Sequence, residues 1–198
     1  MKIQKAWPNI KIRHGVRHSR QISKKYNSPT VWTPPQSGWI KANFDRAAQR
    51  GGGLYWVGVV FRAHSGSIIK LGAQCIKEGT NNEAEVYAAW LAIRRARKMG
   101  IKKLYLEGDS LIIIQAIKNG QIKAWHLQNF ISLILEDLSH FEEVMVSHIK
   151  WEGNTDADKL SKWVLSFNQI EDSIFEVFDG VVWRQDGGYI HLPNKEAT

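Results

Sequence analysis

The sequence predicts an α/β protein built on a mixed five-stranded sheet with helices packed on its faces. Two observations predict this class: three strand patterns joined by short turns come first, and helical patterns then alternate with two further strands. Strands joined by short turns pair antiparallel, whereas strands connected through a helix lie parallel in one sheet. The predicted order of elements is therefore β-β-β-α-β-α-α-β-α. With 43% hydrophobic residues and nine Trp, the 198-residue chain can bury a sizeable core.

The three leading strands are indicated by the spacing of their apolar side chains. In WIKANFD (39–45), apolar and polar residues alternate, and Asp45 closes the run. LYWVGVVFRA (54–63) and SIIKLGAQCI (67–76) are rich in residues that favour strands, and the short segment HSG separates them. A turn of this length predicts a hairpin, so we expect the three strands to form an antiparallel meander.

The longest predicted helix is TNNEAEVYAAWLAIRRARKMG (80–100). It begins with a threonine and two asparagines, which are favoured at helix starts because their side chains accept hydrogen bonds from free backbone amides. Alanines and other good helix formers follow, and basic residues occupy the last turn. Gly100 supplies the expected stop.

The rest of the regular pattern alternates between strands and helices. KKLYLEGD (102–109) and EEVMVSHIKW (142–151) are predicted strands. SLIIIQAIKNG (110–120), a segment at about 125–139 and NTDADKLSKWVLSF (154–167) are predicted helices, the first ended by a glycine and the last opened by an Asn or Thr cap.

Charge and composition divide the chain into three parts. We expect a basic N-terminal arm with a Pro-containing linker at 1–38, a folded domain at 39–167 and an acidic extension at 168–198 that holds a small hairpin. Residues 1–44 carry nine Lys or Arg and no acid, which accounts for the net charge of +8. A basic, acid-free arm favours a polyanion such as nucleic acid, but a solvated tail or an organelle transit peptide has the same composition.

Composition also limits the compartment. Cys75 is the only cysteine, so an intrachain disulfide is excluded and a reducing compartment is favoured. No apolar run approaches the roughly 20 residues that cross a bilayer, and the start lacks a secretory apolar core. We expect an intracellular monomer without a membrane partner, located in the nucleus or cytoplasm, with an organelle as the alternative.

Four carboxylates fall at comparable places on separate predicted elements. Two end strands and two lie in the first turns of helices: Asp45, Glu85, Asp109 and Asp158. Strand ends and helix starts meet at one rim of such a sheet, where α/β folds place their sites. Four carboxylates brought together repel one another and need a compensating cation. Oxygen ligands select a hard ion, so we expect Mg²⁺ or Mn²⁺.

Each acid also has an ordinary structural explanation. Asp109 can cap the helix that begins at Ser110, and Asp158 can be a first-turn acid favoured by the helix dipole. Glu85 can be a solvated helix residue. Taken singly, these explanations are the simpler ones. They weaken when they must account for four acids at the ends of four elements.

The acids lie in segments that resemble the motif blocks of the ribonuclease H family: NFD (43–45), TNNEAE (80–85), GDS (108–110) and HIKWEGNTDADKLS (148–161). The segment WTPPQSGWIKANFD is similar to the leading part of the plant ribonuclease-H-like domain related to non-LTR retrotransposon polyproteins. The resemblance covers about residues 32–167 and implies a ribonuclease-H-like fold.

The resemblance implies an endonuclease that cleaves the RNA strand of RNA/DNA hybrids with two Mg²⁺ or Mn²⁺ ions. Its metal-binding and catalytic acids match Asp45, Glu85, Asp109 and Asp158. His148 matches a histidine that helps to move protons or release product. Two ions about 3.5–4 Å apart can clamp the attacking water and the leaving oxygen of an in-line displacement, with Asp45 bridging both.

The same resemblance implies residues that bind the substrate. Asn81 and Asn82 match asparagines that contact the minor groove of the hybrid, although either can instead cap the long helix. An asparagine amide both donates and accepts hydrogen bonds, which suits the 2′-hydroxyl groups displayed there. Asn154 also matches the family pattern. Of the two acids in NTDAD, Asp158 fits the family spacing better than Asp156.

Departures from the family pattern keep a second function open. Arg46 stands where the family has glycine, and it either contacts a phosphate or crowds the substrate. Leu111 replaces a polar residue, and only Lys118, Lys123 and Trp125 stand in for a basic protrusion, with Trp125 expected in the core. The alternative is a domesticated, retroelement-derived nucleic-acid-binding module with weak or no nuclease activity. Another nuclease or a recombinase of the same fold is disfavoured by the motif spacing.

Overall fold

The computed structural model of the chain describes residues 28–48, 54–76 and 79–165, together with short strands outside these ranges. The strands are β1 (Ile12–Arg13), β2 (Ile40–Ala48), β3 (Tyr55–Arg62), β4 (Ile68–Ile76), β5 (Lys103–Gly108), β6 (Glu143–His148), β7 (Ser173–Phe178), β8 (Val181–Arg184) and β9 (Tyr189–His191). The helices are α1 (Asn81–Lys98), α2 (Leu111–Asn119), α3 (Gln128–Leu138) and α4 (Thr155–Leu165), with short 3-10 turns at Trp125–Leu127 and Trp151–Gly153.

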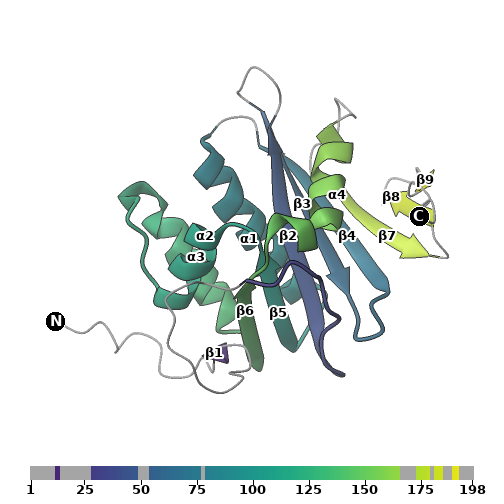
Figure 1. Ribbon diagram of the computed structural model, residues 1–198, viewed down its shortest axis with the longest axis horizontal. Coiled ribbons are helices and arrows are strands. Elements are labelled where there is room, and N and C mark those ends of the chain that lie inside the picture. The colour runs from purple at the N-terminus through teal and green to yellow at the C-terminus, as the bar shows by residue number, and fades with distance from the viewer. Residues whose placement is uncertain are drawn as a thin grey trace.

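The predicted mixed five-stranded sheet is confirmed, in the order β6-β5-β2-β3-β4 (Figure 1). The meander β2-β3-β4 is antiparallel, and β2 pairs parallel with β5, which pairs parallel with β6. The described strands continue this sheet at both edges. β1 pairs with β6, and β7, β8 and β9 follow β4, because each exposed edge offers free backbone groups to a further strand.

Helices cover both faces of the central sheet. Helices α1 and α2 pack on one face, α3 lies on the same side and packs against α1 and α2, and α4 lies on the other face (Figure 1). Alternation along β2 sends Ala42 and Phe44 into the main hydrophobic core on the α1 side. Lys41, Asn43 and Asp45 therefore belong to the opposite face, where they are nevertheless buried. The polar half of β2 is thus held inside the protein.

The main core explains why the predicted helices form where they do. α1 buries an alanine-rich face against β2 and β3, and α2 buries Ile113, Ile114 and Ile117 beside β5 and β6. α2 ends at Gly120, whose φ of 72° is the left-handed conformation that favours glycine. Among the described helices, none combines the length and the apolar character needed to cross a bilayer.

Two predicted strand boundaries were wrong. β2 does not close at Asp45 but continues to Ala48, since Ala47 and Ala48 still pair with β3. The strand predicted over 142–151 ends at His148, and the chain then turns into a 3-10 segment. The predicted Thr/Asn start of α1 agrees with the structure: Thr80 is the cap and forms a reciprocal capping box with Glu83, so neither Asn81 nor Asn82 is the cap residue.

Candidate metal and active site

Strands β2 and β5 bring Asp45 and Asp109 to one edge of the sheet. The last parallel pair joins Phe44 to Gly108, where β5 ends, so Asp45 and Asp109 are the next residues on the two strands. A Cβ added to Gly108 would lie 2.4 Å from the Phe44 ring. Only glycine allows this close approach, and the packing fixes the start of the turn that carries Asp109.

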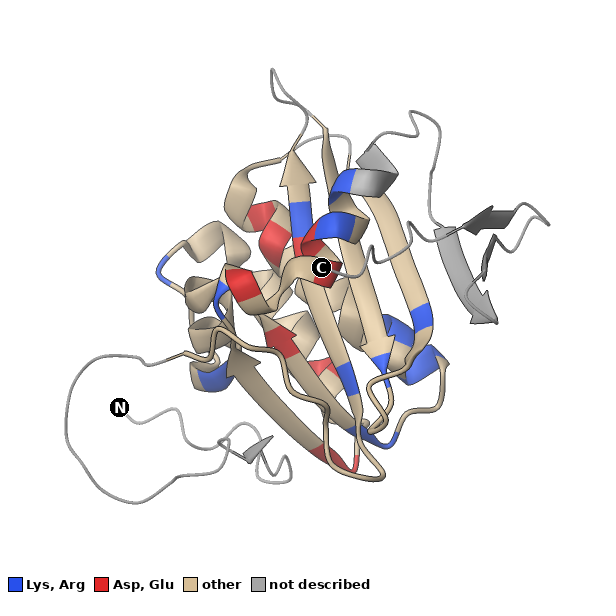
Figure 2. Ribbon diagram, turned by 45° about the vertical axis from the view of Figure 1, so that its right-hand side comes forward, with Lys and Arg blue, Asp and Glu red and all other residues tan. Residues whose placement is uncertain are grey.

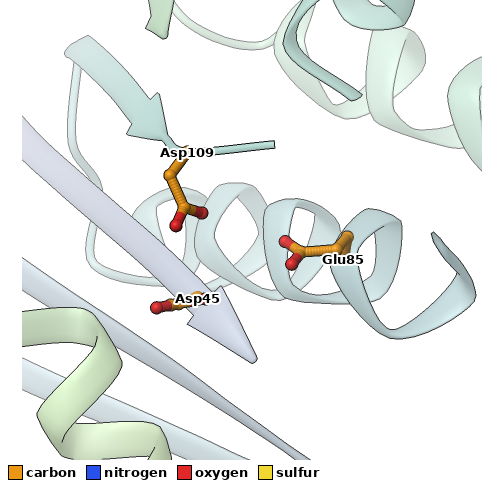
Figure 3. A group of neighbouring side chains, drawn as sticks. All are labelled: Asp45, Glu85 and Asp109. Carbon is orange, nitrogen blue, oxygen red and sulfur yellow. The ribbon is translucent and has the colours of Figure 1, made fainter. Parts of the chain in front are cut away.

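Helix α1 supplies the third carboxylate. The capping box at Thr80 fixes the start of the helix, and Glu85 follows in its first turns with only 9% of its surface exposed. Asp45, Glu85 and Asp109 each offer one oxygen within 4.8 Å of the others. Figure 3 shows them approaching from a strand, a helix and the turn after a second strand. Hereafter, these three residues are the rim cluster.

The fourth predicted ligand, Asp158, lies near the rim cluster but not within it. Its carboxylate forms an ion pair with Lys162, 2.7 Å away and one turn later on α4. Burial is the main cause of the raised pKa of Asp45 and of Asp109, and the charge of Asp158 adds to both shifts, so it lies within electrostatic range of the rim cluster. Figure 2 shows the acidic segments gathering between α1, β2 and α4.

Glycine 58 sets the distance between α4 and the sheet. Gly58 is the β3 partner of Asp45, and a Cβ there would come within 2.9 Å of the Ser161 backbone nitrogen. The missing side chain lets α4 approach β3 directly behind the rim cluster. Asp156, the other candidate acid, instead forms an ion pair with the buried guanidinium of Arg62. That pairing supports the preference for Asp158.

The rim cluster contains carboxyl groups that resist ionisation. Burial raises the pKa of Asp45 to about 8, and the neighbouring charges of Asp109 and Glu85 add to the effect. Burial also raises the pKa of Glu85 to about 7, with a further contribution from Asp109. The pKa of Asp109 is raised by burial, against a backbone hydrogen bond and His148. A cation bound by these carboxylates would favour their ionised forms and so lower these pKa values.

The donor set fits a hard divalent cation. Glu85 Oε2 is buried and has no hydrogen-bond partner, which is costly unless another group binds it. The Nε of Arg46 lies 3.2 Å from the other oxygen of Glu85, and the Arg46 amide donates to Asp45 Oδ1 at 2.7 Å. The carboxylate oxygens come from a strand, a helix and a turn, and one of these oxygens has no hydrogen-bond partner, so they are suitable ligands for Mg²⁺ or Mn²⁺.

His148 lies beside the site with both ring nitrogens occupied. Nε2 lies 2.9 Å from the backbone carbonyl oxygen of Asp109, to which it can donate, and Nδ1 is hydrogen-bonded to the Ser28 hydroxyl. The backbone amide of Lys150 donates to the Pro29 carbonyl. His148 therefore joins the turn that carries Asp109 to the segment that precedes β2. A role in proton transfer would require one of these bonds to open.

The predicted substrate-binding asparagines are in two different environments. Asn81 and Asn82 are exposed at the start of α1, one turn before Glu85. Asn154 is only 1% exposed; its Nδ2 donates to the Phe44 carbonyl at 2.9 Å, and its Oδ1 accepts from Asn43. The structure thus places Asn154 beneath the site, where it joins α4 to β2 and cannot contact a substrate.

A second polar group behind the rim cluster was not predicted. It comprises four residues of β2, β5 and β6, here named the interior cluster: Lys41, Asn43, Glu107 and Ser147. The alternation in WIKANFD was the available signal, because it places Lys41 and Asn43 on the face of Asp45.

The expectation that Trp125 is in the core was wrong, since 84% of it is exposed.

Comparisons with known proteins agree with this geometry. The family described as reverse transcriptase-like matches residues 43–164. Ribonuclease HI of Halobacterium salinarum is 28% identical over 161 residues, covering 77% of this chain and 79% of that protein. A putative ribonuclease H protein of Arabidopsis thaliana is 26% identical over 156 residues, which cover 76% of this chain but 25% of the longer protein.

Solved structures share the fold. The crystal structure of RNase H1 from Halobacterium salinarum has a TM-score of 0.61 and 27% identity, covering 65% of this chain and 98% of that one. LC11-RNase H1, solved in complex with an RNA/DNA hybrid, has a TM-score of 0.56 and 24% identity over 61% of this chain and 92% of that one. The central sheet and its helices are therefore an arrangement already known from ribonucleases H.

Proposed function

The chain belongs to the reverse transcriptase-like family, and we propose that it is an endonuclease that cleaves the RNA strand of RNA/DNA hybrids with bound divalent cations. The observation that carries the proposal is the rim cluster, in which Asp45, Glu85 and Asp109 converge from three elements. The relatives named ribonuclease H add support, as does the related structure that holds a hybrid. Asp158 completes the proposed set of acids from α4.

The proposed chemistry assigns a role to each acid. Two bound Mg²⁺ or Mn²⁺ ions would activate the attacking water and offset charge on the leaving 3′ oxygen. Asp45, whose carboxylate is influenced by all the other acids, is the proposed shared ligand. Glu85, Asp109 and Asp158 would hold the ions from either side. His148 would keep the Asp109 turn in place and, once released from Asp109 or Ser28, transfer protons.

Substrate selection is proposed to depend on the exposed start of α1. Asn81 and Asn82 present free amide groups one turn from Glu85. Such groups can donate to and accept from the 2′-hydroxyls in the wide minor groove of a hybrid. Arg46, whose side chain is 26% exposed, is available to a phosphate next to the scissile bond.

The decisive assay incubates the full chain with a labelled RNA/DNA hybrid in Mg²⁺ or Mn²⁺. We expect cleavage of the RNA strand by the wild type and none by Asp45→Asn or Asp109→Asn. Glu136→Gln is the matched control, because Glu136 is an exposed acid on α3 and its loss should leave cleavage unchanged. Duplex DNA and duplex RNA test the preference for a hybrid.

One outcome of this assay would favour the second candidate function. Arg46 beside Asp45 and Leu111 beside Asp109 alter the surface that meets the substrate, which is the observation in favour of a retroelement-derived binding module. Binding of the hybrid without cleavage in either metal would establish that module and reject the nuclease. The match of residues 43–164 to the reverse transcriptase-like family fits a retroelement ancestry.

The basic arm is proposed to add affinity for the same polyanion. Truncation before Ser28 is the appropriate test, because Ser28 and Pro29 bond to the domain itself. We expect weaker hybrid binding and a shallower dependence of affinity on salt, since fewer counterions are released. An unchanged salt slope would assign the arm to targeting or solvation instead.

A further inference from the structure

Two acids of the proposed site are already paired with basic side chains of this chain. Glu85 lies beside Arg46, and Asp158 beside Lys162. The Lys162 pair lies one helical turn apart on the surface of α4, where such pairs are common. The Arg46 pair is different. It joins β2 to α1, and it brings a cation to one of the three carboxylates that converge in the rim cluster.

Arg46 contacts the site at two points. It directly follows Asp45, and its backbone amide donates to the Asp45 carboxylate at 2.7 Å. Its side chain belongs to the opposite face of β2, towards α1, and there its Nε reaches Glu85 Oε1 at 3.2 Å. The charge of Arg46 also acts against the burial of Glu85, because it favours the ionised carboxylate.

The ion pair between Arg46 and Glu85 is incomplete. Arg46 Nε and Glu85 Oε2 are both buried without a hydrogen-bond partner, so the two groups are close but poorly aligned. A well-formed arginine–carboxylate pair would instead make two parallel hydrogen bonds. The guanidinium therefore supplies charge without saturating the carboxylate. Such a contact is readily displaced by a divalent cation, which brings twice the charge to the carboxylate oxygens and can bind the oxygen that Arg46 leaves without a partner.

We propose that Arg46 is a built-in counter-cation that competes with the divalent ion for Glu85. This inference rests on the proposed function, because it takes the rim cluster to be a metal site. In the metal-free protein, Arg46 partly neutralises Glu85. Metal binding then requires the guanidinium to leave, and the cost of its departure lowers the affinity of the site. The released guanidinium, on a partly exposed side chain near the end of β2, becomes available to a phosphate of the substrate.

The test measures metal binding directly. Isothermal titration of the full chain with Ca²⁺ or Mn²⁺, without nucleic acid, compares the wild type with Arg46→Gln and Arg46→Lys. We expect Arg46→Gln to bind the ion about 3- to 10-fold more tightly, since a partly buried competing charge is removed. Arg46→Lys keeps the charge and should stay close to the wild type. The metal-induced rise in Tm gives a second readout.

A matched control separates local competition from net charge. Arg97→Gln removes the same charge from another arginine–carboxylate pair, with Asp137, on the other end of α1. Its metal affinity should equal that of the wild type. Equal affinity of the wild type and Arg46→Gln, or weaker binding by Arg46→Gln, would overturn the inference and leave the proposed nuclease standing. Absence of binding by the wild type and Arg46→Gln alike would overturn both.

Discussion

Strands β2 and β5 carry two polar groups within a few residues of each other, the interior cluster and the rim cluster. Each is centred on a buried carboxylate, Glu107 in the first and Asp45 in the second. Glu107 is 2% exposed and Asp45 is 6% exposed, so both charges are removed from water to a similar degree. The two groups differ in what the protein provides around each charge.

The interior cluster is fully compensated. Lys41 Nζ lies 3.2 Å from each carboxylate oxygen of Glu107 and 2.7 Å from the Thr33 carbonyl oxygen. Asn43 and Ser147 donate to the same carboxylate, each at 3.1 Å. Burial lowers the pKa of Lys41, but the opposite charge of Glu107 acts against this shift. Every charged group here has a partner from the chain.

The rim cluster is left short of partners. Three carboxylates share one space. Among the residues that the structure describes, Asp45 accepts a hydrogen bond from the next backbone amide, and Glu85 Oε2 accepts none. Natural proteins tolerate a buried charge without a partner at few places other than functional sites. Burial alone therefore does not distinguish the two clusters. The balance of charge does: Lys41 compensates the single carboxylate of the interior cluster, whereas Arg46 forms an incomplete ion pair with one of the three carboxylates of the rim cluster. The rim cluster is therefore the one that needs a ligand.

Among the changes that test this difference between the two clusters, we expect the largest effect from Asp45→Asn. Hybrid cleavage should fall by at least about 10³-fold, because a proposed shared metal ligand is lost. The metal-free protein should nevertheless become more stable at pH 8, since a repelled buried carboxylate is replaced by a neutral amide. Cleavage rates in the presence of metal check the first expectation, and the Tm in EDTA checks the second. A lower Tm would mean that Asp45 is structurally satisfied after all.

For Glu107→Gln in the interior cluster, we expect a loss of stability instead of a gain. Removing one partner leaves Lys41 buried without its counter-charge, which should cost about 3 kcal/mol in the free energy of unfolding. Urea denaturation measures the loss. Combining this change with Lys41→Met should cost less than the sum of the two single changes, because the orphaned charge is gone. Strict additivity would show that the two side chains do not act as a pair.

The pH dependence of stability provides a further test of the difference between the two clusters. The pKa of Asp45, about 8, and that of Glu85, about 7, exceed their unfolded values near 4, so the folded chain binds more protons between these limits. Raising the pH from 4 to 8 in EDTA should therefore lower the Tm, by about 2–6 °C. Saturating Mg²⁺ should remove most of this loss. Asp45→Asn should reduce this dependence of the Tm on pH. An unchanged dependence would refute the assignment of a raised pKa to Asp45.

The smallest effect is expected at the edge of the interior cluster. Trp32 Nε1 donates to Asn43 Oδ1 at 2.8 Å, and Trp32→Phe removes that donor while keeping most of the apolar contact. We expect a loss of about 1 kcal/mol in stability and no change in metal affinity. Denaturation and calorimetry together test this separation. A parallel loss of metal binding would show that the two clusters are coupled.

The sequence predicted the elements of the fold because their signals are local. Apolar periodicity, Gly100 and Gly120 were enough to find α1, α2 and the five central strands. The end of β2 could not be predicted, since it depends on pairing with a strand that follows a turn. The attachment of β7 to β4 is equally nonlocal, because only the folded sheet creates that edge.

The sequence predicted which three acids lie together but not the partners of the side chains around them. The grouping of Asp45, Glu85 and Asp109 followed from strand ends and a helix start, which topology brings together. The buried position of Asn154 and the ion pair of Arg46 depend on side-chain packing between α4, β2 and α1. No sequence spacing specifies such contacts. Roles in catalysis stay predictions until the variants are measured.

The bonds from Ser28 to the last residue of β6 and from Pro29 to Lys150 have a consequence for delivery of a substrate. They fix the root of the N-terminal arm beside the turn that carries Asp109, rather than at a remote corner of the domain. A nucleic acid captured by the arm would then be tethered within a short chain length of the acids. Tethering of this kind raises local concentration without any new contact at the cleavage point.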